Sequence, residues 1–185
     1  MDDELSQQLQ DCIALGVART PHQNLLFIVD QLVESAARAL SPGVNDPYTA
    51  IICMRWLGSG LIVMTHRQDP EPYRYDSDEN LRVVAKSVTF RDVCSAIIDQ
   101  LRPYYATDRN AAIQMMQTIA TVRSCTRNED RRALLNEHAD KLLTSAQMIP
   151  LSEYDITHLR DADQRVSSDG SGDDQGQREP EWTNG

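Results

Sequence analysis

Seven residues at positions 41–47, Ser-Pro-Gly-Val-Asn-Asp-Pro, separate two long segments whose apolar residues recur at helical spacing. A proline has no N–H to donate and clashes with the preceding helical turn, so neither segment can run through this stretch as one continuous helix. Residues 21–40 and 47–66 are therefore predicted to form two helices joined by a tight connector, an αα-hairpin. This feature limits the fold to helices that pack on helices.

The rest of the chain agrees with an all-α helical bundle of about six helices. Only 5% of the 185 residues are aromatic, and aliphatic side chains dominate the 41% that are hydrophobic. Apolar periodicity predicts further helices at residues 2–17, 89–105, 129–148 and 155–166, and one that begins after Asp108. Thr89 and Asp92 are predicted to form a capping box, and Asp108 is predicted to cap the helix that follows it. The helix at 155–166 is expected to be poorly anchored. One helical domain is predicted at residues 1–166.

Two segments depart from the helical pattern. Residues 66–80 are polar and contain two prolines, and residues 81–86 alternate weakly between apolar and charged side chains. At most a small β-hairpin is predicted here, in which residues 73–75 pair with the alternating segment. Residues 167–185 are rich in Ser, Gly, Asp and Gln, which predicts a disordered acidic tail.

The charge distribution excludes one class of partner. The formal net charge is −10, and the last 34 positions hold nine acidic and three basic residues, which is −6 of that total. Nucleic acid is not expected as a partner, because its phosphates require a basic face. The N-terminus is acidic and polar, unlike an export signal. Residues 48–65 are interrupted by Arg55 and by a Gly-Ser-Gly, and they fall short of the about 20 apolar residues of a membrane span. The chain is expected to be soluble and cytoplasmic.

Cysteine and histidine spacing gives no support for a cofactor or metal. The four cysteines, Cys12, Cys53, Cys94 and Cys125, lie 31 to 41 residues apart in apolar stretches. That spacing predicts free thiols in a reducing compartment rather than a zinc or redox site. The four histidines form no pair at helical spacing and no HExxH motif, and the common nucleotide-binding and serine-nucleophile motifs are absent from the sequence. No cofactor is expected.

The connector has both a structural and a functional interpretation. Structurally, Asp46 can cap the following helix, Pro47 fits its first turn, and Gly43 permits a left-handed turn. Functionally, a helix N-terminus with free N–H groups lies among polar side chains that could hold a small anion or polar group. The candidate ligand-binding residues are Arg38, Ser41, Asn45, Asp46 and Thr49. Both interpretations stay open on the sequence alone.

The same stretch carries a resemblance to a known family. The run LVESAARALSPGVNDPYTA, at residues 32–50, resembles the signature of a bacterial family of predicted integral membrane proteins, domain of unknown function 2254. The resemblance is strongest over residues 19–61 and stays in register to about residue 143. Two departures are the replacement of the family's Gln-Asp by Gln23-Asn24 and of its Leu-Asp-Arg-Leu by residues 54–57, Met-Arg-Trp-Leu.

The resemblance implies a soluble C-terminal part of a longer membrane protein. The family's transmembrane helices should lie upstream, so membrane association is expected only through helices absent from this chain. The first hypothesis is a non-enzymatic helical interaction or regulatory module. The alternative is a small-ligand or enzymatic site at the connector. A homo-oligomer is also expected, through the apolar face of residues 2–17, which presents Leu5, Leu9, Cys12 and Ile13.

Overall fold

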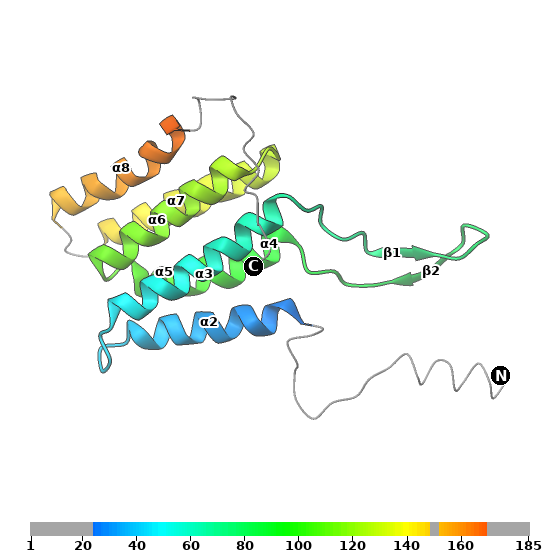
Figure 1. Cartoon of the computed structure of the whole chain (residues 1–185), viewed down its shortest axis with the longest axis horizontal. Coiled ribbons are helices and arrows are strands. Elements are labelled where there is room, and N and C mark those ends of the chain that lie inside the picture. Colours follow the sequence, from blue (N-terminus) through cyan, green and yellow to red (C-terminus); the bar gives the residue numbers. More distant parts are fainter. Residues whose placement is uncertain (1–23, 149–151, 170–185) are drawn as a thin grey trace, which may run out of the picture.

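The computed structural model describes residues 24–148 and 152–169, and shows a helical bundle from which one β-hairpin extends (Figure 1). The helices are α2 (Leu25–Ala39), α3 (Pro47–Thr65), α4 (Phe90–Cys94), α5 (Gln100–Tyr105), α6 (Arg109–Cys125), α7 (Glu129–Gln147) and α8 (Glu153–Asp169). The strands are β1 (Tyr73–Tyr75) and β2 (Leu81–Val84), which pair antiparallel. The predicted all-α bundle with a small hairpin is confirmed. The helix expected at residues 2–17 lies outside the described residues.

The predicted αα-hairpin is formed by α2 and α3, which pack against each other in opposite directions (Figure 1). The start of its first helix was predicted incorrectly. We expected Pro21 at the first helical position, but α2 begins at Leu25, after Asn24 in extended conformation. Thr20 and Pro21 themselves lie outside the described residues. The end at Ala39 and the start of α3 at Pro47 agree with the positions of Pro42 and Pro47.

The predicted helix at residues 89–105 is a single rod with a π-helical turn, η1 (Ser95–Asp99), between α4 and α5. Its start is set by a capping box between Thr89 and Asp92, as predicted. Pro103 lies inside α5 and lacks the N–H that would bond to the Asp99 carbonyl in an α-helix. The π-helical turn therefore ends at Asp99, the residue whose carbonyl cannot accept an α-helical hydrogen bond from Pro103.

The remaining helices cover the α3 side of the bundle. Asp108 caps α6 by accepting the Ala111 N–H at 2.8 Å, which confirms its predicted role. Next along the chain, α7 packs on α6, and α8 packs on both. The expectation of a poorly anchored last helix was wrong, because Leu159 and Ala162 of α8 are buried against α6 and α7. The periodicity of residues 155–166 correctly predicted a helix. Which helices it packs against depends on the tertiary fold, which a local pattern does not contain.

The core is mostly aliphatic, and the buried hydroxyl of Tyr105 makes a hydrogen bond within it. Leu61, Leu101, Met115, Ile119 and Leu142 are each at most 1% exposed. Tyr105 is also fully buried, and its hydroxyl donates to the Ala50 carbonyl at 2.6 Å, which ties α5 to the first turn of α3. A buried hydroxyl needs such a partner to offset its desolvation.

Candidate functional site

The connector between α2 and α3 is held by hydrogen bonds within itself. Asp46 accepts the Thr49 N–H at 3.1 Å and the Thr49 hydroxyl at 2.6 Å, which confirms Asp46 as the N-cap of α3. The Thr49 side-chain hydrogen bond, followed by the backbone one, lowers the pKa of Asp46 below its ordinary value. The structure therefore brings Asp46 and Thr49 together, in the geometry of a helix cap.

The left-handed residue of the connector is not the one that we predicted. Asn45 adopts a φ of 49°, whereas the φ of Gly43 lies outside the left-handed region. Asparagine tolerates this conformation better than most residues because its short polar side chain bonds locally. The turn is closed by the Ser41 carbonyl, which accepts the N–H groups of Val44 at 3.0 Å and Asn45 at 2.9 Å.

The two other candidate residues also bond locally. The Ser41 hydroxyl donates to the Arg38 carbonyl at 2.7 Å, and the Arg38 guanidinium pairs with Glu34 one turn earlier on α2. Both side chains of that ion pair are more than 60% exposed, at 69% and 63%. The cavities beside Arg55, Asp69 and Thr157 in the described part of the chain are lined by other residues. Ligand binding by Arg38, Ser41, Asn45, Asp46 and Thr49 stays a prediction.

A second feature is the β-hairpin, whose strands leave their apolar side chains in solvent. Every residue of β1 and β2 is exposed. The large apolar ones are Tyr73, Tyr75, Leu81, Val83 and Val84, which are 48% to 63% exposed. The hairpin extends away from the helices (Figure 1). An isolated two-stranded hairpin is marginally stable in water, so this one depends on its attachment or on a partner.

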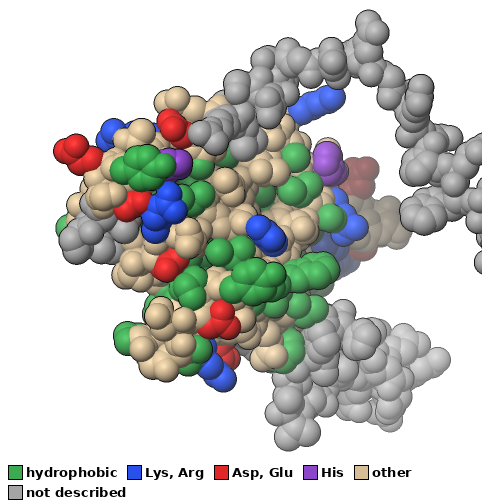
Figure 2. All heavy atoms as spheres, turned by 60° about the vertical axis from the view of Figure 1, so that its left-hand side comes forward, with side chains coloured by type: hydrophobic (Ala, Val, Ile, Leu, Met, Phe, Trp, Pro, Cys, Tyr) green, Lys and Arg blue, Asp and Glu red, His purple; other side chains and the backbone are tan. Residues whose placement is uncertain are grey.

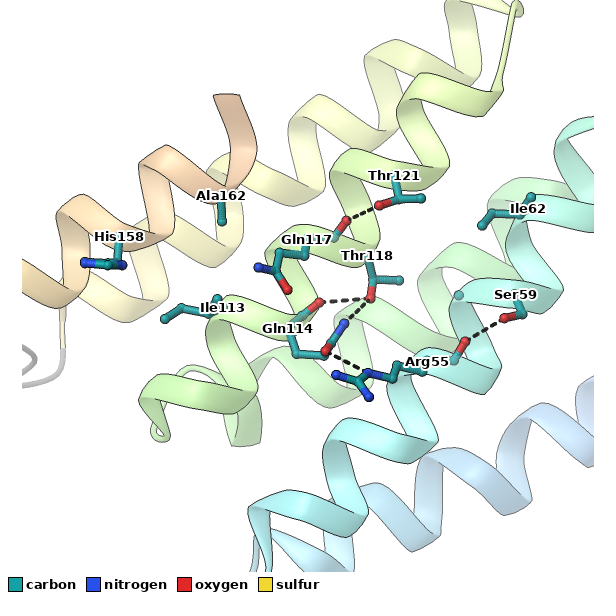
Figure 3. Close-up of a pocket in the computed structure, with 11 residues that line it drawn as sticks. Arg55, Ser59, Ile62, Ile113, Gln114, Gln117, Thr118, Thr121, His158 and Ala162 are labelled. Carbon is teal, nitrogen blue, oxygen red and sulfur yellow. Dashed lines mark hydrogen bonds between the residues drawn. The ribbon is translucent and has the colours of Figure 1, made fainter. Parts of the chain in front are cut away.

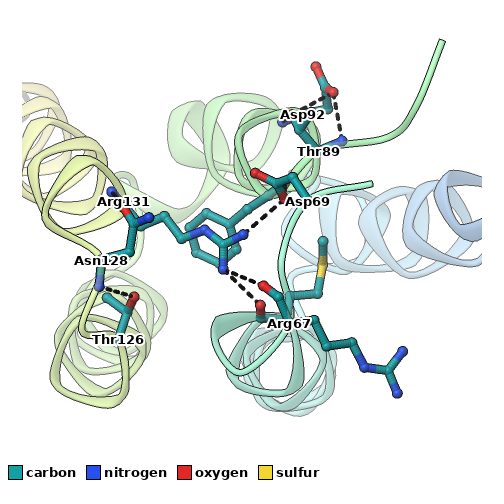
Figure 4. A network of polar contacts seen from close by, with 9 residues as sticks. Arg67, Asp69, Thr89, Asp92, Thr126, Asn128 and Arg131 are labelled. Atoms are coloured by element: carbon teal, nitrogen blue, oxygen red, sulfur yellow. Dashed lines mark hydrogen bonds and ion pairs between the residues drawn. The ribbon is translucent and has the colours of Figure 1, made fainter. Parts of the chain in front are cut away.

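The root of the hairpin is firmly fixed by Arg131 of α7 (Figure 4). The Arg131 guanidinium donates to the carbonyls of Met64 and Arg67, both at 2.9 Å, and pairs with Asp69 at 3.0 Å. Asp69 in turn accepts the Phe90 N–H at 2.8 Å, and the guanidinium lies 4.8 Å from the Phe90 ring centroid. The chain entering the hairpin is thus tied to the chain leaving it.

The outward face of α3 exposes a further apolar stripe. Tyr48, Ile52, Trp56 and Val63 recur at helical spacing on the side opposite the buried residues of α3, and Tyr48 and Trp56 are 70% and 67% exposed. Hydrophobic side chains also gather on the face shown in Figure 2, with few charged groups among them. Exposed aromatic side chains of this kind are typical of contact surfaces.

A groove with many polar side chains lies beside this stripe, between α3, α6 and α8 (Figure 3). It measures about 490 Å³ and contains Arg55, Gln114, Gln117 and His158. Sequence reasoning missed it. One signal was present, since Gln114, Gln117, Thr118 and Thr121 recur at helical spacing on α6. The sequence did not show that α3 and α8 flank this polar face.

Comparison with known proteins identifies the family. The family model described as Predicted membrane protein (DUF2254) matches residues 1–121, which include the connector, the hairpin and most of α6. The chain belongs to this family. Proteins similar to this chain include the uncharacterized proteins Mb1321c of Mycobacterium bovis and Rv1290c of Mycobacterium tuberculosis. Each is 27% identical to it over 135 residues. No solved structure matches the chain.

The DUF2254 chain spans about a quarter of the length of these relatives: the matched part is 73% of this chain and 26% of each of them. In the described part of the chain, one helix, α3, is long and apolar enough to cross a membrane, with 19 residues and a mean hydropathy of 1.3. From the sequence, we did not expect this segment to span a membrane, because Arg55 and a Gly-Ser-Gly interrupt it and it is short of about 20 apolar residues. Core helices of soluble proteins pass the same test, and α3 packs against both α2 and α6.

Proposed function

We propose that this chain is a non-enzymatic interaction module in the cytoplasmic part of a membrane protein, and that the β1–β2 hairpin binds the hairpin of a second copy. The observation that carries the proposal is the hairpin itself: its root is fixed by Arg131, while its apolar side chains are exposed. The free thiols of Cys53, Cys94 and Cys125 support a reducing compartment.

Strand pairing is the contact that this hairpin suits best. The outer edge of a strand presents unpaired N–H and C=O groups, which a second strand can satisfy. The Ala85 N–H points toward β1 and donates to the Pro72 carbonyl at 2.7 Å. Successive N–H groups along a strand point to opposite edges, so the Val84 N–H points away from β1. This leaves the outer edge of β2 open to a new partner.

The sequence of β2 favours a second copy of the same strand. Symmetric antiparallel pairing would place Val83 opposite Val83 of the other copy, and Arg82 opposite Val84. No like charges then face each other across the two strands, and apolar side chains meet. The acidic tip, with Asp76, Asp78 and Glu79, disfavours anionic lipid as the partner.

Sedimentation equilibrium at micromolar protein tests the proposal. The parent chain should be a dimer or larger, and Val83→Lys should be a monomer, because two lysines would face each other at the symmetry axis. Since Val83 is 55% exposed, the substitution should leave the helical bundle folded. Met148→Lys is the matched control, because Met148 is an 84% exposed apolar residue at the C-cap of α7, and it should leave the assembly unchanged.

Two outcomes would reject the hairpin as the interface. One is a monomeric parent. The other is a Leu9→Asp variant that is monomeric while Val83→Lys still assembles. That result would place the interface on the apolar face of residues 2–17.

A further inference from the structure

We infer that the groove between α3, α6 and α8 is a binding site for a small anion that carries hydroxyl groups, such as a sugar acid or a sugar phosphate. Its volume of about 490 Å³ lies within the range of small-molecule sites. It is separate from the hairpin and from the connector, so it does not depend on the proposed self-association.

Arg55 supplies the cationic end of the site. Its Nε donates to Gln114 Oε1 at 3.1 Å, which holds the guanidinium between α3 and α6 (Figure 3). Among the described residues that line the groove there is no carboxylate, and Arg55 makes no ion pair within the described part of the chain. Its two terminal nitrogens therefore keep their paired donor geometry for a carboxylate or phosphate.

The hydroxyls of the groove are set to accept hydrogen bonds. Ser59 donates to the Arg55 carbonyl at 2.9 Å, Thr118 to the Gln114 carbonyl at 2.9 Å, and Thr121 to the Gln117 carbonyl at 2.7 Å. Each hydroxyl proton is thus used within its own helix. The Thr118 hydroxyl also accepts from Gln114 Nε2 at 3.4 Å, whereas the lone pairs of Ser59 and Thr121 remain for a ligand. Acceptors in this number favour a ligand that donates hydrogen bonds from hydroxyl groups.

The groove also has fixed walls. Gly58 lets α6 come so close that a Cβ at this position would lie 2.5 Å from Thr118 Cγ2. On the opposite side, the His158 ring of α8 packs against the Tyr154 ring, with centroids 4.3 Å apart and the ring planes tilted by 53°. Ile62, Ile113 and Ala162 supply apolar surface for the carbon skeleton of a ligand. A site with little freedom to rearrange loses less entropy on binding.

Isothermal titration calorimetry with four probes tests the inference: gluconate, glucose 6-phosphate, inorganic phosphate and glucose. We expect at least one of the two hydroxylated anions to bind more tightly than inorganic phosphate, and glucose not to bind. Gluconate alone would mark a carboxylate site, and glucose 6-phosphate alone a phosphate site. Arg55→Ala should weaken binding by about tenfold or more, because it removes charge-assisted hydrogen bonds.

Two further variants separate the parts of the site. Thr121→Val should weaken the hydroxylated anion by about fivefold and leave inorganic phosphate unchanged. Arg132→Ala, at an exposed arginine of α7 outside the groove, should change nothing. The inference is overturned if no probe binds at concentrations up to about 10 mM, or if Arg55→Ala binds as the parent does. Inorganic phosphate binding as tightly as both hydroxylated anions would also overturn it.

Discussion

Gly58 lies where α3 packs tightly against Thr118 of α6, and it offers the sharpest test at the scale of one residue. Gly58→Ala should lower the free energy of unfolding by about 1–3 kcal/mol, because the new methyl group overlaps Thr118 Cγ2. The side chain of Thr118 is held by its bond to the Gln114 carbonyl, so it cannot easily move aside. Urea unfolding measures the change.

Gly60, two residues away on the same helix, is the matched control. A Cβ there meets no atom within 4 Å, so Gly60→Ala should stabilise the chain by about 0.5–1 kcal/mol through its higher helix propensity. Adding Thr118→Ala to Gly58→Ala should restore part of the lost stability. Equal effects of the two glycine variants would show that the helices do not approach at Gly58.

Asp46 is the second residue-scale test. Asp46→Ala should lower the melting temperature, because it leaves the Thr49 N–H at the start of α3 without its acceptor. Asp46→Ser should restore most of the loss, since a serine hydroxyl also caps a helix. Thermal melting of both variants is the measurement. If serine fails to rescue the helix, the carboxylate is needed for something other than capping, which would favour a ligand at the connector.

The elements of the fold were predictable to the extent that their chemistry is local. The cap at Asp46, the capping box at Thr89 and the cap at Asp108 follow from short-range patterns, and the structure has all three. The burial of α8 and the groove beside Arg55 depend on which helices become neighbours. No pattern within a single segment contains that information, so both were missed.

At the scale of elements, Arg131 joins α7 to the end of α3 and to the hairpin root. Arg131→Met should lower the free energy of unfolding by about 2 kcal/mol, because the Met64 and Arg67 carbonyls lose the guanidinium N–H groups and Asp69 loses its cationic partner. Urea unfolding tests this, with Arg132→Met as the control. A loss no larger than that of the control would mean that other contacts hold the root.

His138 couples α7 to the rod that contains η1. It is buried, neither ring nitrogen has a hydrogen bond among the described residues, and Nδ1 lies 3.5 Å from Asp99 Oδ1. Burial lowers the pKa of His138, and the nearby cations Lys141 and Arg102 lower it further. The carboxylates of Asp99 and, more weakly, Glu137 act in the opposite direction and raise this pKa. The lowered folded-state pKa predicts stability that is present above the unfolded value of about 6.5 and lost as pH falls below it.

Urea unfolding at several pH values between about 7.5 and 5 measures this dependence. The parent should lose stability over that range, and His138→Leu should show a flatter dependence. His66→Gln, at an exposed histidine, should follow the parent. A parent and a His138→Leu variant with the same slope would show that His138 takes up its proton in the folded state without cost.

At the scale of the whole molecule, a rigid bundle presents two apolar surfaces in different places. The α3 stripe lies on the bundle itself, and the hairpin stands apart from it on a root fixed by Arg131. The chain belongs to a family of predicted membrane proteins, and we propose that these exposed surfaces serve assembly. The hairpin is the element whose own stability gains most from a partner, since two strands alone are marginal.

Hydrogen exchange of single amides, followed by NMR as protein concentration rises, tests the pairing of β2 most directly. The Val84 amide should exchange quickly in dilute protein and become protected when the chains assemble, because its N–H points away from β1. The Ala85 amide, already bonded to Pro72, serves as the internal reference. Val84 protection that rises with concentration in the parent and is absent from Val83→Lys is the predicted result. A Val84 amide whose exchange is the same at every concentration would contradict the proposal that this hairpin joins two chains.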